Sequence, residues 1–168
     1  MRDFQENRCY VDHLVAEHSR VHKMLKQTRA AIVRSVQPES VRPDKRPTFA
    51  GIGAALRRLK AELAAHFREE ESGGCLDEAV SLCPSLSGDE HRIEGEHAEI
   101  LAGIDGLIGN CQQLPATPQN QHAIQQTFDE LYQRLLTHET AENQLMSQAF
   151  GTVANGADNA QPALIHDV

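Results

Sequence analysis

Apolar residues recur at helical spacing in four separate segments of this chain. The stripes cover residues 11–32, 52–63, 93–111 and 124–149, and prolines or glycines separate them. No segment shows the alternation of a half-buried strand. The pattern therefore predicts an all-α protein, an up-down-up-down four-helix bundle over residues 1–150, followed by a flexible C-terminal tail over residues 151–168.

The chain also repeats itself. His138 and Glu142 lie 72 residues after His66 and Glu70, and the apolar residues before them match at the same offset. His97 lies 79 residues after His18, again within matching apolar stripes. The repeat predicts two similar helical hairpins. Each hairpin supplies one histidine from its first helix and a His-x-x-x-Glu pair from its second.

A histidine and a glutamate four residues apart share one face of a helix. Here that face continues the apolar stripe, so His66, Glu70, His138 and Glu142 are expected to be buried. Burying an ionised carboxylate costs several kcal/mol unless it is paired or binds a metal. A metal centre is therefore expected, and an ordinary bundle with buried polar residues is the less favoured alternative.

The spacing within each hairpin brings the six residues to one height in the bundle interior. Imidazole and carboxylate ligands suit iron, manganese or zinc. We expect two ions, each held by two histidines and bridged by both glutamates. This arrangement leaves room for an oxo or hydroxo bridge and an exogenous ligand. The expected metal ligands are His18, His66, Glu70, His97, His138 and Glu142.

These residues resemble the motifs of the hemerythrin-like family, also called the HHE cation-binding domain, over about residues 10 to 150. The matching segments are Ala16-Glu17-His18-Ser19, His66-Phe-Arg-Glu-Glu70, Gly95-Glu96-His97-Ala98-Glu99 and His138-Glu-Thr-Ala-Glu142. The resemblance implies a bundle with two non-haem iron ions and the six ligands named above. A ferritin-type site, which needs Glu-x-x-His on two helices, fits only at Glu94 and His97.

The chain departs from the oxygen-carrying members of that family. Leu101 stands where they have a further histidine, four residues after His97, and Asn143 stands at their aspartate position. In the other half of the repeat, His22 follows His18 by four residues. His22 is a candidate further ligand, a partner of a ligand, or a histidine with no role. Glu17 and Glu96 point off the ligand face and are either solvated or in contact with a ligand from outside.

Local signals predict where the helices begin and end. Thr48 is a candidate N-cap for the second helix, and Gly73–Gly74 would end that helix before a loop. Residues 87–90, Ser-Gly-Asp-Glu, read as a capping box that opens the third helix. Thr117 followed by Pro118 opens the fourth helix.

Composition excludes several partners. The formal net charge of −8 repels phosphate backbones, so neither nucleic acid nor an anionic membrane is expected to bind. The N-terminal segment has no apolar core of a signal peptide, and no stretch is long enough to span a membrane. A cytoplasmic location is expected, with reduced cysteines. The sequence leaves the oligomeric state open.

Two functions share these residues. The first is a non-enzymatic di-iron module that binds or senses oxygen or nitric oxide. The second is a di-iron oxidoreductase that acts on peroxide or nitric oxide, or a donor of iron for iron-sulfur cluster repair. The sequence does not separate them, and a metal-free interaction bundle is the third alternative.

Overall fold

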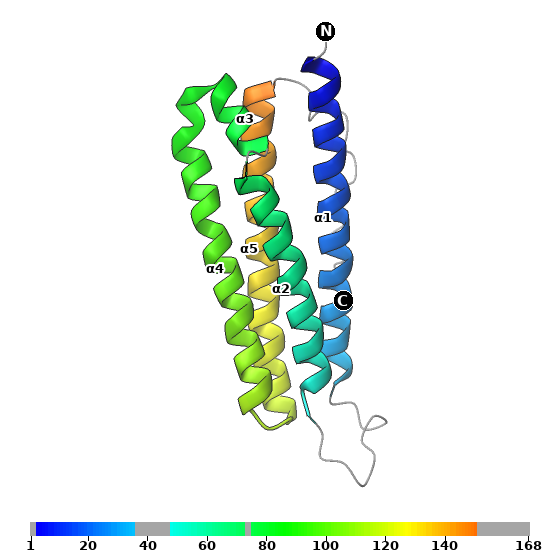
Figure 1. Cartoon of the computed structure of the whole chain (residues 1–168). Helices are drawn as coiled ribbons and strands as arrows, with labels where there is room; N and C mark the ends of the chain where they lie inside the picture. Colours follow the sequence, from blue (N-terminus) through cyan, green and yellow to red (C-terminus); the bar gives the residue numbers. More distant parts are fainter. Residues whose placement is uncertain (1–2, 36–47, 73–74, 151–168) are drawn as a thin grey trace, which may run out of the picture.

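The computed structural model of the protein describes residues 3–35, 48–72 and 75–150, and within these ranges it is helical without any strand (Figure 1). The described side chains begin at residue 16 and leave out Cys75. The expected tail over residues 151–168 and the predicted stop at Gly73–Gly74 lie outside these ranges. The long helices are α1 (Asp3–Arg34), α2 (Ala50–Glu71), α4 (Ser87–Gln113) and α5 (Pro118–Phe150).

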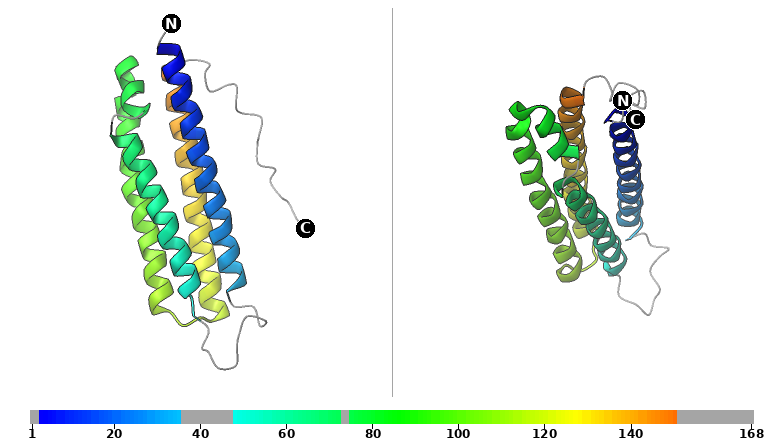
Figure 2. Two further views of the ribbon diagram at one scale, coloured as in Figure 1. Left: turned by 45° about the vertical axis from the view of Figure 1, so that its right-hand side comes forward. Right: turned by 45° about the horizontal axis from the view of Figure 1, so that its top comes forward.

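The four long helices pack side by side. Helix α1 packs against α2 and α5, and α4 packs against the same two helices, so the contacts form a closed ring. Helix α1 ends at the end of the molecule where α2 begins, and the connection from α4 to α5 lies at that end too (Figures 1 and 2). The expectation of an all-α protein with four packed helices is confirmed.

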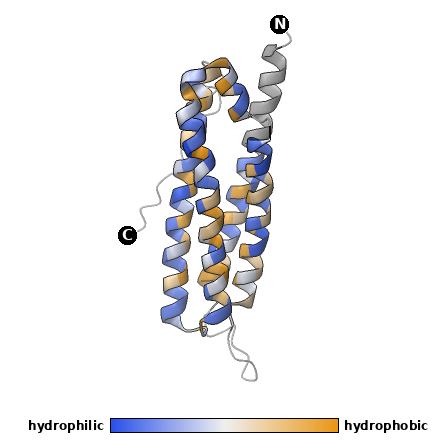
Figure 3. Ribbon diagram, turned by 60° about the vertical axis from the view of Figure 1, so that its left-hand side comes forward, coloured by the Kyte–Doolittle hydropathy of each residue, from blue (hydrophilic) through white to orange (hydrophobic). Residues whose placement is uncertain are grey.

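Hydrophobic and hydrophilic residues are interspersed along the coloured parts of the helices (Figure 3), as expected for helices that bury one face. The buried apolar residues form two clusters. The larger cluster fills the middle of the four helices, with Leu25, Leu56, Ile104 and Phe128 among its fully buried members. Helices α4 and α5 approach closely there, since a Cβ atom at Gly103 would lie 3.1 Å from Leu131 Cδ1.

The smaller apolar cluster lies around a further helix, α3 (Cys75–Leu82), which is followed by the 3₁₀ turn η2 (Pro84–Leu86). Its buried members are Leu76, Ala79, Leu86, Ile93, Leu145 and Met146. Helix α3 packs against α5 at the end of the molecule opposite the α4–α5 connection (Figure 1). The expectation of a simple loop after α2 is therefore wrong. The residues Leu76 and Ala79 have helical spacing and close this end of the core.

The helices begin at or within two residues of the predicted positions, but only one of the three predicted side-chain caps is present. Helix α5 begins at Pro118, and the Thr117 hydroxyl accepts a hydrogen bond from the Asn120 backbone N–H at 3.2 Å. Helix α2 begins one residue after Phe49, which has no side-chain capping bond, so Thr48 is not its N-cap. Helix α4 follows directly from η2 with Leu86 as its N-cap, because the preceding turn already supplies helical backbone.

None of the helices that the structure describes combines the length and the apolar character needed to cross a membrane.

Candidate metal centre

All six residues that the sequence singles out meet between the four long helices. They form two groups of potential ligand atoms, and within each group the atoms lie within 4.8 Å of one another. One group contains His18 from α1 and His66 from α2, and the other contains His97 from α4 and His138 from α5. Both groups also contain Glu70 and Glu142.

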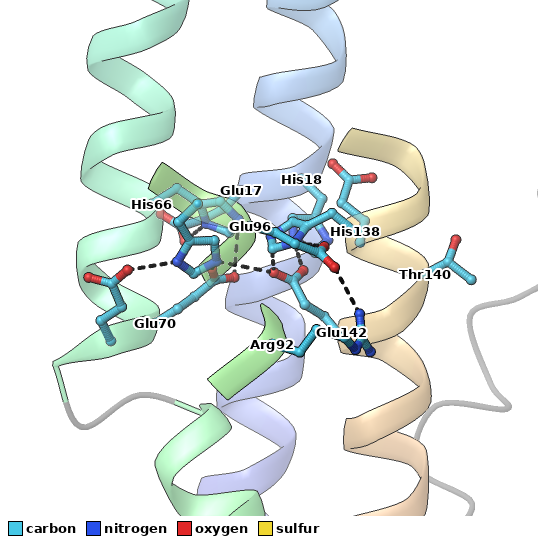
Figure 4. A network of polar contacts seen from close by, with 12 residues as sticks. Glu17, His18, His66, Glu70, Arg92, Glu96, His138, Thr140 and Glu142 are labelled. Carbon is cyan, nitrogen blue, oxygen red and sulfur yellow. Dashed lines mark hydrogen bonds and ion pairs between the residues drawn. The ribbon is translucent and has the colours of Figure 1, made fainter. Parts of the chain in front are cut away.

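The two glutamates lie between the two histidine pairs and direct one oxygen to each (Figure 4). Glu70 Oε1 lies 3.1 Å from His66 Nε2, and Glu70 Oε2 lies 3.4 Å from His97 Nε2. Glu142 Oε2 lies 3.4 Å from His18 Nε2, whereas Glu142 Oε1 lies 2.7 Å from His138 Nε2. A carboxylate with one oxygen on each side is able to bridge two cations.

The atoms at this centre are buried without hydrogen bonds among the described residues. They are Nε2 of His18, His97 and His138 and both carboxylate oxygens of Glu70 and of Glu142. Buried polar atoms normally have partners, and leaving them without one costs free energy. These orphaned atoms are the lone-pair donors that a metal ion requires. The residues present therefore fit a metal centre.

Two of the histidines, whose Nε2 atoms face the centre, contact a carboxylate outside it through Nδ1. His66 Nδ1 lies 3.1 Å from Glu17 Oε2, and His138 Nδ1 lies 3.0 Å from Glu96 Oε2 (Figure 4). An ionised carboxylate only accepts, so each Nδ1 carries the proton and each Nε2 lone pair is left for a metal. Glu17 and Glu96 are thus in contact with ligands, which the sequence left open.

Each of these two carboxylates also contacts an arginine of its own helix. Arg20 donates to Glu17 Oε1 at 2.9 Å, and Arg92 donates to Glu96 Oε1 at 2.8 Å. Both chains of contacts therefore run from an arginine through a glutamate to a histidine. The glutamates are equivalent in the sequence repeat, but the arginines are not, because Arg20 follows Glu17 by three residues and Arg92 precedes Glu96 by four.

A third outer carboxylate, that of Glu71, contacts His97. Its Oε1 lies 2.8 Å from His97 Nδ1. The His97 ring also stacks on Phe67, with ring centroids 4.0 Å apart and an interplanar angle of 5°. Sequence reasoning missed Glu71 because it belongs to an acidic helix end that resembles an ordinary exposed surface. Its position next to Glu70 is the signal that could have identified it.

His22 belongs to neither group of ligand atoms. Its Nε2 instead lies 2.6 Å from Glu139 Oε2, and the His22 side chain is 33% exposed. The ring of Tyr132 lies edge-on to His22, with ring centroids 6.5 Å apart. This geometry does not support the role of a further ligand, and the partner of His22 is Glu139 rather than a candidate ligand.

Without a metal, the pKa values of the two glutamates shift in opposite directions. Burial raises the pKa of Glu70 to about 10, and the negative charges of Glu142 and Glu17 add to this rise. Burial also acts to raise the pKa of Glu142, but close contacts with His138, His18 and His97 lower it well below its usual value. The metal-free centre therefore holds one protonated and one ionised carboxyl group.

The histidine pKa values shift as well. Burial lowers the pKa of His138 and of His18, but nearby carboxylates together outweigh burial, so the net shift is upward for both. Glu142 acts on both histidines, Glu96 on His138 and Glu139 on His18. Burial also lowers the pKa of His66, and there it dominates despite the contact with Glu17. The metal-free centre thus holds protons on Glu70 and on the histidines whose pKa is raised, and metal binding must displace these protons.

The chain matches no protein-family model, and neither a curated protein nor a solved structure shows significant similarity to it.

Proposed function

We propose that this protein is a di-iron protein that binds or senses a small diatomic ligand, oxygen or nitric oxide. The observation that carries the proposal is the pair of shared glutamates. Each directs one carboxylate oxygen to His18 and His66 and the other to His97 and His138. Two cations would each take two imidazoles and one oxygen from each bridging carboxylate.

The charges around the centre favour bound cations. Six glutamates and two arginines lie in or next to the centre, so negative charge exceeds positive charge there. Uncompensated charge in a partly buried site is costly, and bound cations would offset it. These residues are Glu17, Arg20, Glu70, Glu71, Arg92, Glu96, Glu139 and Glu142.

The choice of iron and of the family rests on sequence motifs. Four histidines and two glutamates in this order resemble the hemerythrin-like family, and such ligands suit iron, manganese or zinc. Under this proposal the four packed helices are an up-down-up-down bundle of two similar hairpins, and each hairpin provides three ligands. Iron ions, when bound, supply open coordination positions and electrons for a small ligand.

The centre is most accessible to a small ligand from the side of His18. The His18 side chain is 12% exposed, whereas those of His66, His97 and His138 are at most 4% exposed. A surface hollow along α1 is lined by His18, His22, Lys23 and Lys26 among others. The chain itself thus excludes bulk water from most of the centre and leaves one edge open.

The second candidate is an oxidoreductase acting on peroxide or nitric oxide, or an iron donor. The His22–Glu139 pair favours it, because this pair places a hydrogen-bond donor and acceptor beside His18. Peroxide has O–H groups that such a pair can bind, whereas the diatomic gases have none. Both candidates share the metal ligands.

Metal analysis of anaerobically loaded protein tests the proposal. We expect about two iron ions per chain, and we expect His66→Ala to lose iron while His122→Ala, an exposed residue of α5, keeps it. Absorption spectra after mixing with oxygen, nitric oxide or peroxide separate the candidates. A stable adduct supports ligand binding, and catalytic loss of peroxide supports the oxidoreductase.

Iron loading below about one ion per chain that His66→Ala leaves unchanged would contradict both candidates. Circular dichroism of each variant shows whether the helices are retained.

A further inference from the structure

The two halves of the centre differ at three positions that the repeat makes equivalent. In the repeat, His97 corresponds to His18, and each residue near His97 corresponds to a residue near His18. Glu71 corresponds to Asn143, Phe67 to Glu139, and Leu101 to His22. Glu71 and Phe67 contact His97, whereas Asn143 and Glu139 make no hydrogen bond or ring contact with His18 among the described residues.

His97 is fixed on both sides of its ring. Glu71 accepts a hydrogen bond from Nδ1 at 2.8 Å, and the Phe67 ring stacks on the imidazole. Only 3% of the His97 side chain is exposed. His138, the other imidazole of this group, is fully buried and tied to Glu96. Both imidazoles are therefore held in the orientation that a metal would need.

His18 lacks the equivalent contacts. Among the described residues no hydrogen bond reaches the Nδ1 of His18, and Asn143 is exposed without a side-chain hydrogen bond. Glu139, at the position of the stacking Phe67, instead pairs with His22. Within the described part of the chain, His18 is thus the one histidine of the four whose outer nitrogen has no carboxylate partner, and its edge borders the hollow along α1.

We propose that the two metal positions are unequal, with a retained ion at His97 and His138 and an exchangeable ion at His18 and His66. This inference rests on the proposed function. A carboxylate on the outer nitrogen orients an imidazole and raises its basicity, and its loss weakens metal binding about 10- to 100-fold. Because His18 has no such partner and is the most exposed ligand, its ion dissociates first.

Release of iron to a chelator tests this asymmetry. The protein is loaded anaerobically with Fe²⁺ and mixed with excess chromogenic chelator, and absorbance follows the release. We expect two phases of equal amplitude in the wild-type protein. Glu71→Asn, which gives His97 the surroundings of His18, should accelerate the slow phase about 10-fold and leave the fast phase unchanged.

The reciprocal variant, Asn143→Glu, should slow the fast phase by a similar factor. Glu69→Gln and Gln144→Glu are exposed neighbours on the same helices and serve as charge-matched controls, for which we expect release like that of the wild type. All four substitutions are at exposed positions, so the fold is expected to persist.

Several results would overturn the proposal. A single release phase would show that the two positions are equal. Acceleration of the fast phase by Glu71→Asn would show that the exchangeable ion lies at His97 and His138, contrary to the proposal. An unchanged fast phase in Asn143→Glu would show that the outer nitrogen of His18 does not determine exchange. A wild-type protein that binds no iron contradicts the proposed function itself, whereas two ions released at one rate leave that function standing.

Discussion

At the scale of single residues, Glu70 and Glu142 show how position decides the chemistry of identical side chains. Both are buried between the same four histidines. Glu142 lies close to three imidazoles, which keep it ionised, and its negative charge then helps to raise the pKa of Glu70. The pair shares one negative charge until a metal arrives.

The proton on Glu70 makes the stability of the metal-free protein depend on pH. The folded-state pKa of about 10 lies above the unfolded value near 4.5, so the folded state holds more protons between these limits. The free energy of unfolding then falls as pH rises, by up to about 1.4 kcal/mol per pH unit. Glu70→Gln should remove this contribution, measured by denaturant unfolding of metal-free protein from pH 6 to pH 8.5.

Glu69→Gln is the matched control, since it removes an exposed carboxylate at the adjacent position. It should keep the wild-type dependence on pH. Equal slopes for the wild type and Glu70→Gln would show that Glu70 is ionised in the folded protein.

At the scale of helices, α1 orients a histidine of α2, and α4 orients a histidine of α5. Glu17 of α1 contacts His66 of α2, and Glu96 of α4 contacts His138 of α5. The orientation of each ring therefore depends on the neighbouring helix as well as on the helix that carries the histidine. Hairpin packing and metal affinity are coupled through these contacts.

Replacing Glu17 by glutamine tests this coupling. The amide can still accept from His66 Nδ1, but the negative charge that raises the basicity of the imidazole is lost. We expect metal affinity to fall about 10-fold, measured by competition with a chelator, with little change in folding stability. Glu62→Gln is the control, because Glu62 contacts the same Arg20 at 3.6 Å but contacts no ligand histidine in the described contacts.

Helical periodicity was sufficient to find the four long helices, and the repeat was sufficient to find six residues that meet in space. Contacts between helices were harder to predict. The position of Glu17 beside His18 shows that it points off its own helix's ligand face, but it does not show that α2 lies there. Helix α3 was missed because it is short and follows two glycines, which predict a loop. Its packing against α5, which the local sequence does not reveal, accounts for its burial.

At the scale of the whole molecule, metal binding should stabilise the fold because the ligands come from all four long helices. A metal that binds only the folded state at 100 times its dissociation constant adds about 2.7 kcal/mol. For a chain of this size we expect the melting temperature to rise by about 5 to 10 °C. Calorimetry with and without metal measures this shift.

Addition of a chelator should reverse the rise. Equal melting temperatures with and without saturating metal would mean that the metal binds the unfolded chain equally well or does not bind at these ligands.

The two apolar clusters lie on either side of the centre along α4 and α5. On α4, Ile93 belongs to the smaller cluster and Ile100 to the larger, with His97 between them, and on α5 Leu135 and Leu145 enclose the ligands in the same way. A polar layer thus divides the hydrophobic interior into two compartments. Without metal, we expect the compartment around α3 to open while the larger one stays folded, so that hydrogen exchange would show amide hydrogens around α3 exchanging independently. Metal would join the two compartments into one cooperative unit.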